Sequence, residues 1–283
     1  MSQIDYFTEE CSVEAVNTRM GETINPRLRE VMASLITHLH GFVKEVELTQ
    51  EEWEFAIDFL TRTGQTCDDK RQEFILLSDT LGVSMLVDAI QHRRPEGATE
   101  NTVFGPFHVD GAPELEMGAN ISLDGKGEQC LYEGRVLDLD GNPIEGVRID
   151  VWSDNSEGFY DVQQPDEQPV WNNRGVFITG PDGRYWFTGI KPVSYPIPDD
   201  GPVGQMLRHL GRHPWRPAHM HFLLDHPDYE RIVTHTFVAG DTYLTSDTVF
   251  GVKESLILDY AANPDVKTGW QAHFDFVMNP HEQ

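Results

Sequence analysis

The stretch Arg216-Pro-Ala-His-Met-His-Phe222 carries two histidines spaced two residues apart. Side chains at i and i+2 of a β-strand project from the same face, whereas on a helix they point apart. The spacing therefore predicts a strand that presents His219 and His221 together, where they could share a metal ion. Two histidines on a strand need not bind anything, so the rest of the chain has to decide between the two interpretations.

Upstream of this strand, residues 26–94 follow helical periodicity. Pro26 suits the first position of a helix, and apolar residues then recur at spacings of three and four. The sequence Thr49-Gln-Glu-Glu52 has the form of a capping box, which predicts a second helix that closes at Gly64. A third helix is expected to begin from a cap at Asp68 or Asp69, with a break at Gly82.

Beyond residue 100, glycine, proline and aspartate recur every several residues, which is typical of short strands. Leu131–Leu137 and Val147–Trp152 alternate apolar and polar residues around the turn sequence Asp140-Gly-Asn-Pro143, and this predicts a hairpin. Further strands are predicted at Gly175–Thr179, Arg184–Thr188, His219–Leu224, Ile232–Val238 and Trp270–Val277. The pattern favours an α+β protein with a helical domain over residues 1–100 and an antiparallel β-sandwich over residues 101–283.

The composition narrows the possible partners and location. Asp and Glu number 47 against 21 Lys and Arg, a formal net charge of −26, which argues against a nucleic-acid partner. The three cysteines, Cys11, Cys67 and Cys130, show no CxxC spacing, so neither a disulfide framework nor a thiolate zinc site is indicated. The sequence contains no signal peptide and no membrane span, and we expect a cytoplasmic protein.

Two tyrosines stand where loops would begin at strand edges. Tyr160 lies in Gly158-Phe-Tyr-Asp161, and Tyr195 lies in Pro192-Val-Ser-Tyr-Pro-Ile-Pro198. The ordinary pKa of tyrosine is about 10, so binding a metal as phenolate requires a strongly Lewis-acidic ion such as Fe(III). Most tyrosines in β-proteins only pack, so their positions alone leave both interpretations open.

The ordered set Gly158-Phe-Tyr160, Tyr195-Pro-Ile-Pro198 and Arg216–Phe222 resembles the intradiol ring-cleaving dioxygenases, specifically the catechol 1,2-dioxygenase group. The resemblance spans nearly the whole chain, including the helical N-terminal block. It implies that Tyr160, Tyr195, His219 and His221 bind one non-haem Fe(III) in each subunit. It also implies that Tyr195 leaves the iron when an aromatic diol binds, and that Arg216 places a positive charge beside the substrate ring.

The pocket residues resemble the subgroup that cleaves hydroxyquinol (1,2,4-trihydroxybenzene) with O2 to 3-hydroxy-cis,cis-muconate, a form of maleylacetate. That resemblance assigns a pocket lined by Leu76, Asp79, Val103, Phe104, Gly105, Pro106, Phe107, Ile197, Pro198, Arg216 and Val249. Asp79 could accept a hydrogen bond from the third hydroxyl and so disfavour substrates that lack it. His235 stands where catechol-cleaving relatives commonly carry glutamine, and we expect it to act in the pocket.

Other functions remain open from the sequence alone. Catechol or chlorocatechol cleavage, giving cis,cis-muconates, is the alternative within the same enzyme family. A zinc hydrolase would use His219, His221 and a carboxylate, and a non-catalytic β-sandwich module would use neither histidine. The resemblance further implies a homodimer formed through the N-terminal helices, with a phospholipid bound at its interface.

Overall fold

The computed structural model describes residues 6–21, 25–69, 71–264 and 269–281, and it divides the chain into two compact units, Met1–Arg62 and Thr63–Gln283. The first unit contains helices α1 (Ser12–Asn17) and α2 (Pro26–Glu45) and the start of α3 (Gln50–Thr66), which ends in the second unit. Among the described residues, no helix is both long and apolar enough to cross a bilayer.

The predicted starts of α2 and α3 are confirmed. Asn25 caps α2 by accepting a hydrogen bond from the Leu28 amide at 3.0 Å, and Pro26 takes the first position. The capping box forms in both directions, because the Thr49 amide donates to Glu52 at 2.9 Å and the Glu52 amide donates to Thr49 at 3.3 Å. The predicted end at Gly64 is wrong: Gly64 does not adopt a positive φ, and the helix continues to Thr66.

The third predicted helix is two helices, α4 (Glu73–Thr80) and α5 (Val83–Gln91). Gly82 separates them with a φ of 73°, as its position in the sequence predicts. The predicted cap is wrong, because α4 begins after Gln72, while Asp68 instead accepts the Arg71 amide in the preceding turn. Both helices belong to the same compact unit as the strands. A functional boundary at residue 100 stays a prediction.

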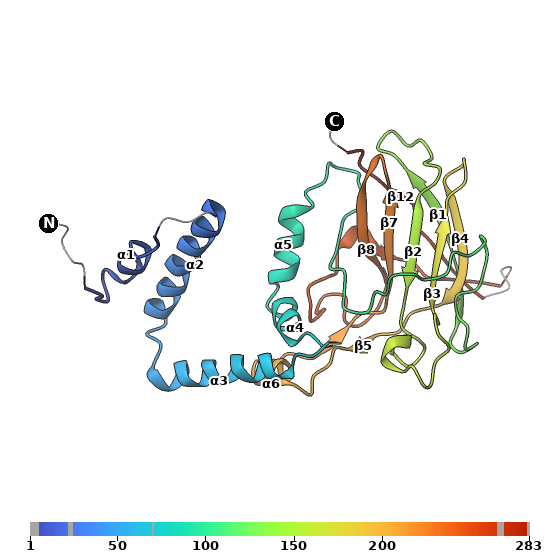
Figure 1. The fold of residues 1–283 in the computed structure, drawn as a ribbon. Helices are drawn as coiled ribbons and strands as arrows, with labels where there is room; N and C mark the ends of the chain where they lie inside the picture. Colours follow the sequence, from blue (N-terminus) through green and yellow to red (C-terminus); the bar gives the residue numbers. More distant parts are fainter. Residues whose placement is uncertain (1–5, 22–24, 70, 265–268, 282–283) are drawn as a thin grey trace. The chain divides into compact units, whose positions relative to one another are not determined.

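A two-layered β-sandwich forms most of the second unit, and the predicted α+β class is confirmed (Figure 1). One sheet has the order β3-β2-β7-β8-β9, with bounds Arg174–Ile178, Arg148–Trp152, His219–His226, Tyr229–Val238 and Ile257–Leu258. The other has the order β10-β11-β1-β12, with bounds Ala261–Asn263, Gly269–His273, Gln129–Leu137 and Phe276–Val277, and β4 (Arg184–Ile190) also pairs with β1. A separate ribbon joins β5 (Tyr195–Pro196) to β6 (Trp215–Arg216), and α6 (Pro202–His209) lies between them in the chain.

The predicted hairpin of β1 and β2 is wrong, because the two strands belong to different sheets. β1 pairs with β4, whereas β2 lies between β3 and β7 and is buried over Ile149–Trp152. The turn between them therefore carries the chain from one sheet to the other. The sandwich is also not wholly antiparallel: β11 and β12 pair with β1 in parallel, and β9 pairs with β8 in parallel.

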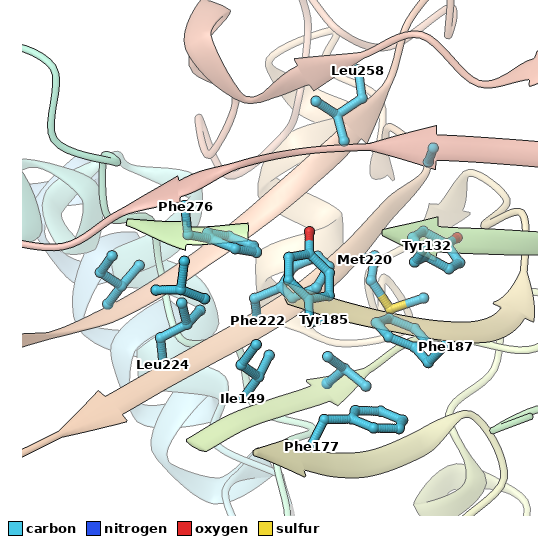
Figure 2. Close-up of a cluster of buried hydrophobic side chains, with 14 of the residues drawn as sticks. Tyr132, Ile149, Phe177, Tyr185, Phe187, Met220, Phe222, Leu224, Leu258 and Phe276 are labelled. Atoms are coloured by element: carbon cyan, nitrogen blue, oxygen red, sulfur yellow. The ribbon is translucent and has the colours of Figure 1, made fainter. Parts of the chain in front are cut away.

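A continuous apolar core fills the space between the sheets (Figure 2). Phe187 of β4 stacks on Phe177 of β3 and on Tyr132 of β1, with ring centroids 5.0 Å apart in both pairs. Aromatic pairs of this kind add about 0.5–1.5 kcal/mol to the burial of their area. The core thereby holds the two sheets together through strands that are distant in sequence.

Strand β7 is buried on both of its faces. Met220, Phe222 and Leu224 point into the core, as the alternation of a strand requires (Figure 2). His219 and His221 therefore project from the opposite face, together with His235, which pairs with His221 across β7 and β8. The site of interest thus lies on the outer face of one sheet rather than between the sheets.

Leu224→Ala should lower the free energy of unfolding by about 2–5 kcal/mol, because it leaves a cavity in this core. Leu139→Ala is the matched control, since Leu139 is 40% exposed whereas Leu224 is fully buried. Urea denaturation followed by tryptophan fluorescence measures both. Equal losses in the two variants would contradict the assignment of Leu224 to the core.

Candidate metal centre

The two histidines of β7 are held in fixed orientations. His219 is 1% exposed, and its Nδ1–H donates to the Pro217 carbonyl at 2.7 Å, which leaves Nε2 as the free lone pair. His221 stacks on Trp152 of the neighbouring strand β2, with ring centroids 4.6 Å apart and planes 14° apart. On another side, a Cβ at Gly105 would stand 3.1 Å from the His221 ring, so glycine allows the 103–107 segment to approach this closely.

Tyr160 comes from the loop that follows β2 and immediately precedes the short 3₁₀ helix η1 (Asp161–Gln163). Its amide donates to the Gln163 side chain at 2.9 Å, and Phe107 stacks on its ring at 4.5 Å. The next residue, Asp161, makes a buried ion pair with Arg174 at 2.6 Å, which anchors the loop to β3. The loop is therefore fixed by polar contacts on one side and an aromatic contact on the other.

Tyr195 comes from the β5–β6 ribbon, where it pairs with Arg216. Its loop passes close to the Tyr160 loop, because a Cβ on Gly158 would lie 2.9 Å from the Cβ of Tyr195. Gly158 also has a φ of 82°, which side-chain-bearing residues rarely adopt. Both the close approach of the two loops and the positive φ therefore require glycine at position 158.

The four predicted ligands meet at one point. The Tyr160 hydroxyl lies 2.9 Å from His221 Nε2 and 3.2 Å from the Tyr195 hydroxyl, which in turn lies 3.4 Å from His219 Nε2. All four side chains are at most 5% exposed. Ligand atoms that each stand about 2 Å from one ion are separated by about 3 Å, so the set has the dimensions of a metal site.

Burial controls the protonation of these groups. It raises the pKa of Tyr160 well above its ordinary value, with Tyr195 adding to the rise, and it raises the pKa of Tyr195 against the opposing charge of Arg216. Burial also lowers the pKa of His219 and of His221 well below the usual range, helped by Arg216 and by His235 respectively. The site therefore offers neutral imidazoles, together with phenols that need a strong Lewis acid to ionise.

Arg216 is buried beside the four groups, with Nη1 3.3 Å from His219 Nε2. Its partner is Asp247, which accepts from the guanidinium Nε at 3.2 Å and from the Gly251 amide at 2.9 Å. Burial opposes the charge of the guanidinium, but Asp247 outweighs it and raises the pKa of Arg216 above its ordinary value. The site thus contains a permanent positive charge.

His235 is fully buried, with its ring centroid 4.1 Å from that of His221. Its Nδ1 is hydrogen-bonded to the Thr102 hydroxyl, and its Nε2 has no hydrogen-bond partner. Burial lowers the pKa of His235 well below its ordinary value, and the adjacent His219 adds to the shift. This imidazole is therefore neutral at pH 7.

The predicted pocket residues fall into three groups. Leu76, Val103, Ile197 and Val249 pack together with Leu207, which the sequence did not indicate. Phe104, Gly105 and Phe107 lie against Trp152, His221 and Tyr160 respectively. Pro106 and Pro198 are exposed and lie at the surface.

Asp79 of α4 is partly buried near the Arg216–Asp247 pair. Burial raises the pKa of Asp79, while a hydrogen bond from Ser84 and the charge of Arg216 lower it in part. The carboxyl group is therefore partly withdrawn from solvent, with a cation nearby.

Trp152, Asp247 and Thr102 also contribute to the site, and sequence reasoning did not predict them. A buried arginine requires an acidic partner, yet the chain has 47 acidic residues, and spacing does not identify which one folds back onto Arg216. Trp152 lies against His221 because β2 pairs with β7, and Thr102 is hydrogen-bonded to His235 of β8. Neither contact is local in sequence.

A cavity of about 600 Å³ lies elsewhere in the second unit, lined among others by Arg93, Arg94, Lys253 and Phe274. None of its lining residues was predicted to belong to the site.

The donor set suits ferric iron, and within the described part of the chain it lacks the carboxylate on which the zinc hydrolase alternative depended. Two phenols and two imidazoles within contact of one point suit a strongly Lewis-acidic ion. Among the described residues, the cluster of His, Cys, Asp and Glu able to hold a metal consists of His219, His221 and His235, without the carboxylate that the hydrolase alternative needs.

Comparison with known proteins identifies the family. Residues 103–280 match the Dioxygenase family, and residues 25–99 match the family described as Catechol dioxygenase N terminus. A hydroxyquinol 1,2-dioxygenase of Rhizobium sp. is 57% identical, with 96% of each chain covered, and a 6-chlorohydroxyquinol 1,2-dioxygenase of Cupriavidus pinatubonensis is 53% identical, with 94% of this chain and 96% of the relative covered.

A solved structure agrees with the sequence comparison. The hydroxyquinol 1,2-dioxygenase of Pseudomonas putida DLL-E4 superposes with a TM-score of 0.92 at 48% identity, covering 96% of this chain and 99% of that one. Identity of this extent over whole chains excludes a non-catalytic module. The chain belongs to the intradiol ring-cleaving dioxygenases, a family of non-haem iron enzymes.

Proposed function

We propose that this chain cleaves hydroxyquinol between its two adjacent hydroxylated carbons, adding both atoms of O2 to give 3-hydroxy-cis,cis-muconate. The observation that carries the proposal is the convergence of Tyr160, Tyr195, His219 and His221 on one buried point. The names of the relatives with the highest identities support the choice of a trihydroxylated ring. Catechol and chlorocatechol are the alternative substrates.

The four converging side chains would hold one Fe(III) in each subunit. When bound, ferric iron would supply a Lewis acid that favours loss of the diol protons, and the deprotonated ring would be electron-rich enough to react with O2. The protein fixes three of these four side chains beforehand, through Pro217 for His219, Trp152 for His221 and the Asp161–Arg174 pair for Tyr160. Such outer contacts orient metal ligands and hold their tautomers.

Tyr195 is the residue that we assign as the base. Its hydroxyl stands between Tyr160 and His219, and the charge of Arg216 favours its ionised form. As a phenolate it would accept a proton from the incoming diol at its oxygen and withdraw, leaving room for the substrate. Arg216 would then stabilise negative charge that develops on the ring, in a buried site.

The substrate wall accounts for selectivity. Leu76, Val103, Ile197 and Val249 provide an apolar surface for the flat ring, and Asp79 offers an oxygen acceptor at one place on it. A third hydroxyl that donates to Asp79 would satisfy this carboxylate. A ring without that hydroxyl would cover Asp79 without replacing the hydrogen bond that water gives it, at a cost of about 1–3 kcal/mol.

Family members are generally dimeric, and the N-terminal helices are the surface that we propose for pairing. One face of α2 exposes Leu28, Val31, Leu35, Leu39 and Phe42 at helical spacing. A second copy of this chain would cover that stripe, and a phospholipid chain could occupy what remains of it.

The cysteines are free thiols, which fits our proposal of a cytoplasmic location.

Oxygen uptake by the iron-loaded enzyme, measured side by side with hydroxyquinol, catechol and chlorocatechols, tests the proposed function. We expect the highest kcat/KM with hydroxyquinol. Faster turnover of catechol would move the assignment to the alternative substrate. If none of these substrates causes oxygen uptake, the proposed function is overturned.

Tyr160→Phe and Tyr195→Phe separate the two phenolates. Iron bound by tyrosinate absorbs visible light, so each variant should shift or weaken that band. Tyr195→Phe should keep much of its iron but bind substrate more slowly, because the base is gone. Stopped-flow absorbance and iron analysis measure these effects, and an unchanged rate in Tyr195→Phe would contradict the role of this residue.

Arg216→Lys should lower kcat by about 10²-fold, because an ammonium group in this buried site cannot reproduce the fixed planar donors of the guanidinium. Iron content and the visible band should change little, since Arg216 is not a ligand. Arg231→Lys is the control, as this arginine pairs with Asp225 at the surface and its side chain is 60% exposed. Equal activity in the two variants would remove Arg216 from the mechanism.

Asp79→Ala should reduce kcat/KM for hydroxyquinol about tenfold or more, while the value for catechol falls less or rises. Asp79→Asn keeps an acceptor and should recover part of the preference. The ratio of the two kcat/KM values is the measurement. An equal loss of kcat/KM for both substrates would show that Asp79 does not recognise the third hydroxyl.

A further inference from the structure

Three imidazoles, rather than two, meet at the metal centre. His219, His221 and His235 each offer a ring nitrogen, and these nitrogens lie within 4.8 Å of one another. All three side chains are at most 2% exposed. His235 comes from β8, directly opposite His221, so the sheet register fixes it at this place.

His235 has the features of a metal ligand. Its Nδ1 is hydrogen-bonded to Thr102, while its Nε2 is buried without any hydrogen-bond partner. His219 is likewise held through its Nδ1–H, which donates to the Pro217 carbonyl, while its Nε2 lies 3.3 Å from Arg216 Nη1 and 3.4 Å from the Tyr195 hydroxyl. Histidines that bind metals commonly have one ring nitrogen held by an oxygen in this way, which directs the other nitrogen to the ion.

We propose that His219, His221 and His235 form a second coordination mode of this centre, which binds a divalent ion such as Zn²⁺ or Co²⁺ without either tyrosine. Imidazole suits these ions, and three histidines with one open position form a familiar zinc environment. A shift of about 1 Å in the side chains would bring the nitrogens to the separation of about 3.3 Å that a tetrahedral ion requires.

The second mode has a consequence for the iron enzyme, and to that extent the inference rests on the proposed function. Both modes use His219 and His221, so one ion excludes the other. Zn²⁺ held by three imidazoles leaves both phenols protonated and gives the site no visible absorption. Availability of zinc relative to iron would therefore set the active fraction of the enzyme.

Titration of the iron-free full-length chain with Zn²⁺ alone, followed by calorimetry, tests this mode, and Co²⁺ alone reports the geometry through its visible bands. We expect one ion per chain and four-coordinate Co²⁺ spectra. His235→Gln should weaken Zn²⁺ binding about 10- to 100-fold, as should Thr102→Val to a smaller degree. Tyr160→Phe should leave Zn²⁺ affinity unchanged.

The outcomes separate the inference from the proposed function. Unchanged Zn²⁺ affinity in His235→Gln, or an equal loss in Tyr160→Phe, would overturn the three-histidine mode. If His235→Gln does not fold, Thr102→Val decides, and unchanged affinity there overturns it as well. Reconstitution with Fe(III) is scored independently by the tyrosinate band, which His235→Gln should retain. Loss of that band from the unaltered chain would contradict the ferric site and leave the zinc result standing.

Discussion

The alternation of side chains along β7 is the constraint on which the rest of the structure depends. Met220, Phe222 and Leu224 are committed to the core between the sheets, and this fixes His219 and His221 on the other face. A slip of one residue would exchange the two sets and bury imidazoles among aliphatic groups. Burial of these core residues therefore stabilises the sandwich and also determines which face of the sheet presents the histidines.

The sequence predicted several local features correctly, although the helix end at Gly64 and the cap at Asp68 or Asp69 were wrong, and it failed for several pairings between distant segments. The capping box at Thr49 and the break at Gly82 depend on neighbouring residues and were predicted correctly. The β1–β2 hairpin was wrong, because the same alternating pattern and turn also suit a chain that crosses between sheets. Parallel pairing of β11 with β1 has no local signal at all.

The candidate site shows the same division. Spacing predicted that His219 and His221 share a face, while Tyr160 and Tyr195 could be joined to them only through resemblance to a family. The three-dimensional arrangement adds what neither route supplied: Asp247 as the buried partner of Arg216, Trp152 under His221, and Thr102 behind His235. Each of these residues acts on a predicted one across a gap of tens of residues or across a strand boundary.

Tyr195 and Arg216 pair across the β5–β6 ribbon, in which each strand is two residues long. Cross-strand partners in such a ribbon project to the same side. They form one mechanical piece, anchored at its far end by the hydrogen bonds that Asp247 makes to Arg216 and Gly251. The residue proposed as the base and the buried cation beside it are therefore carried by one short backbone element, whose position Asp247 helps to fix.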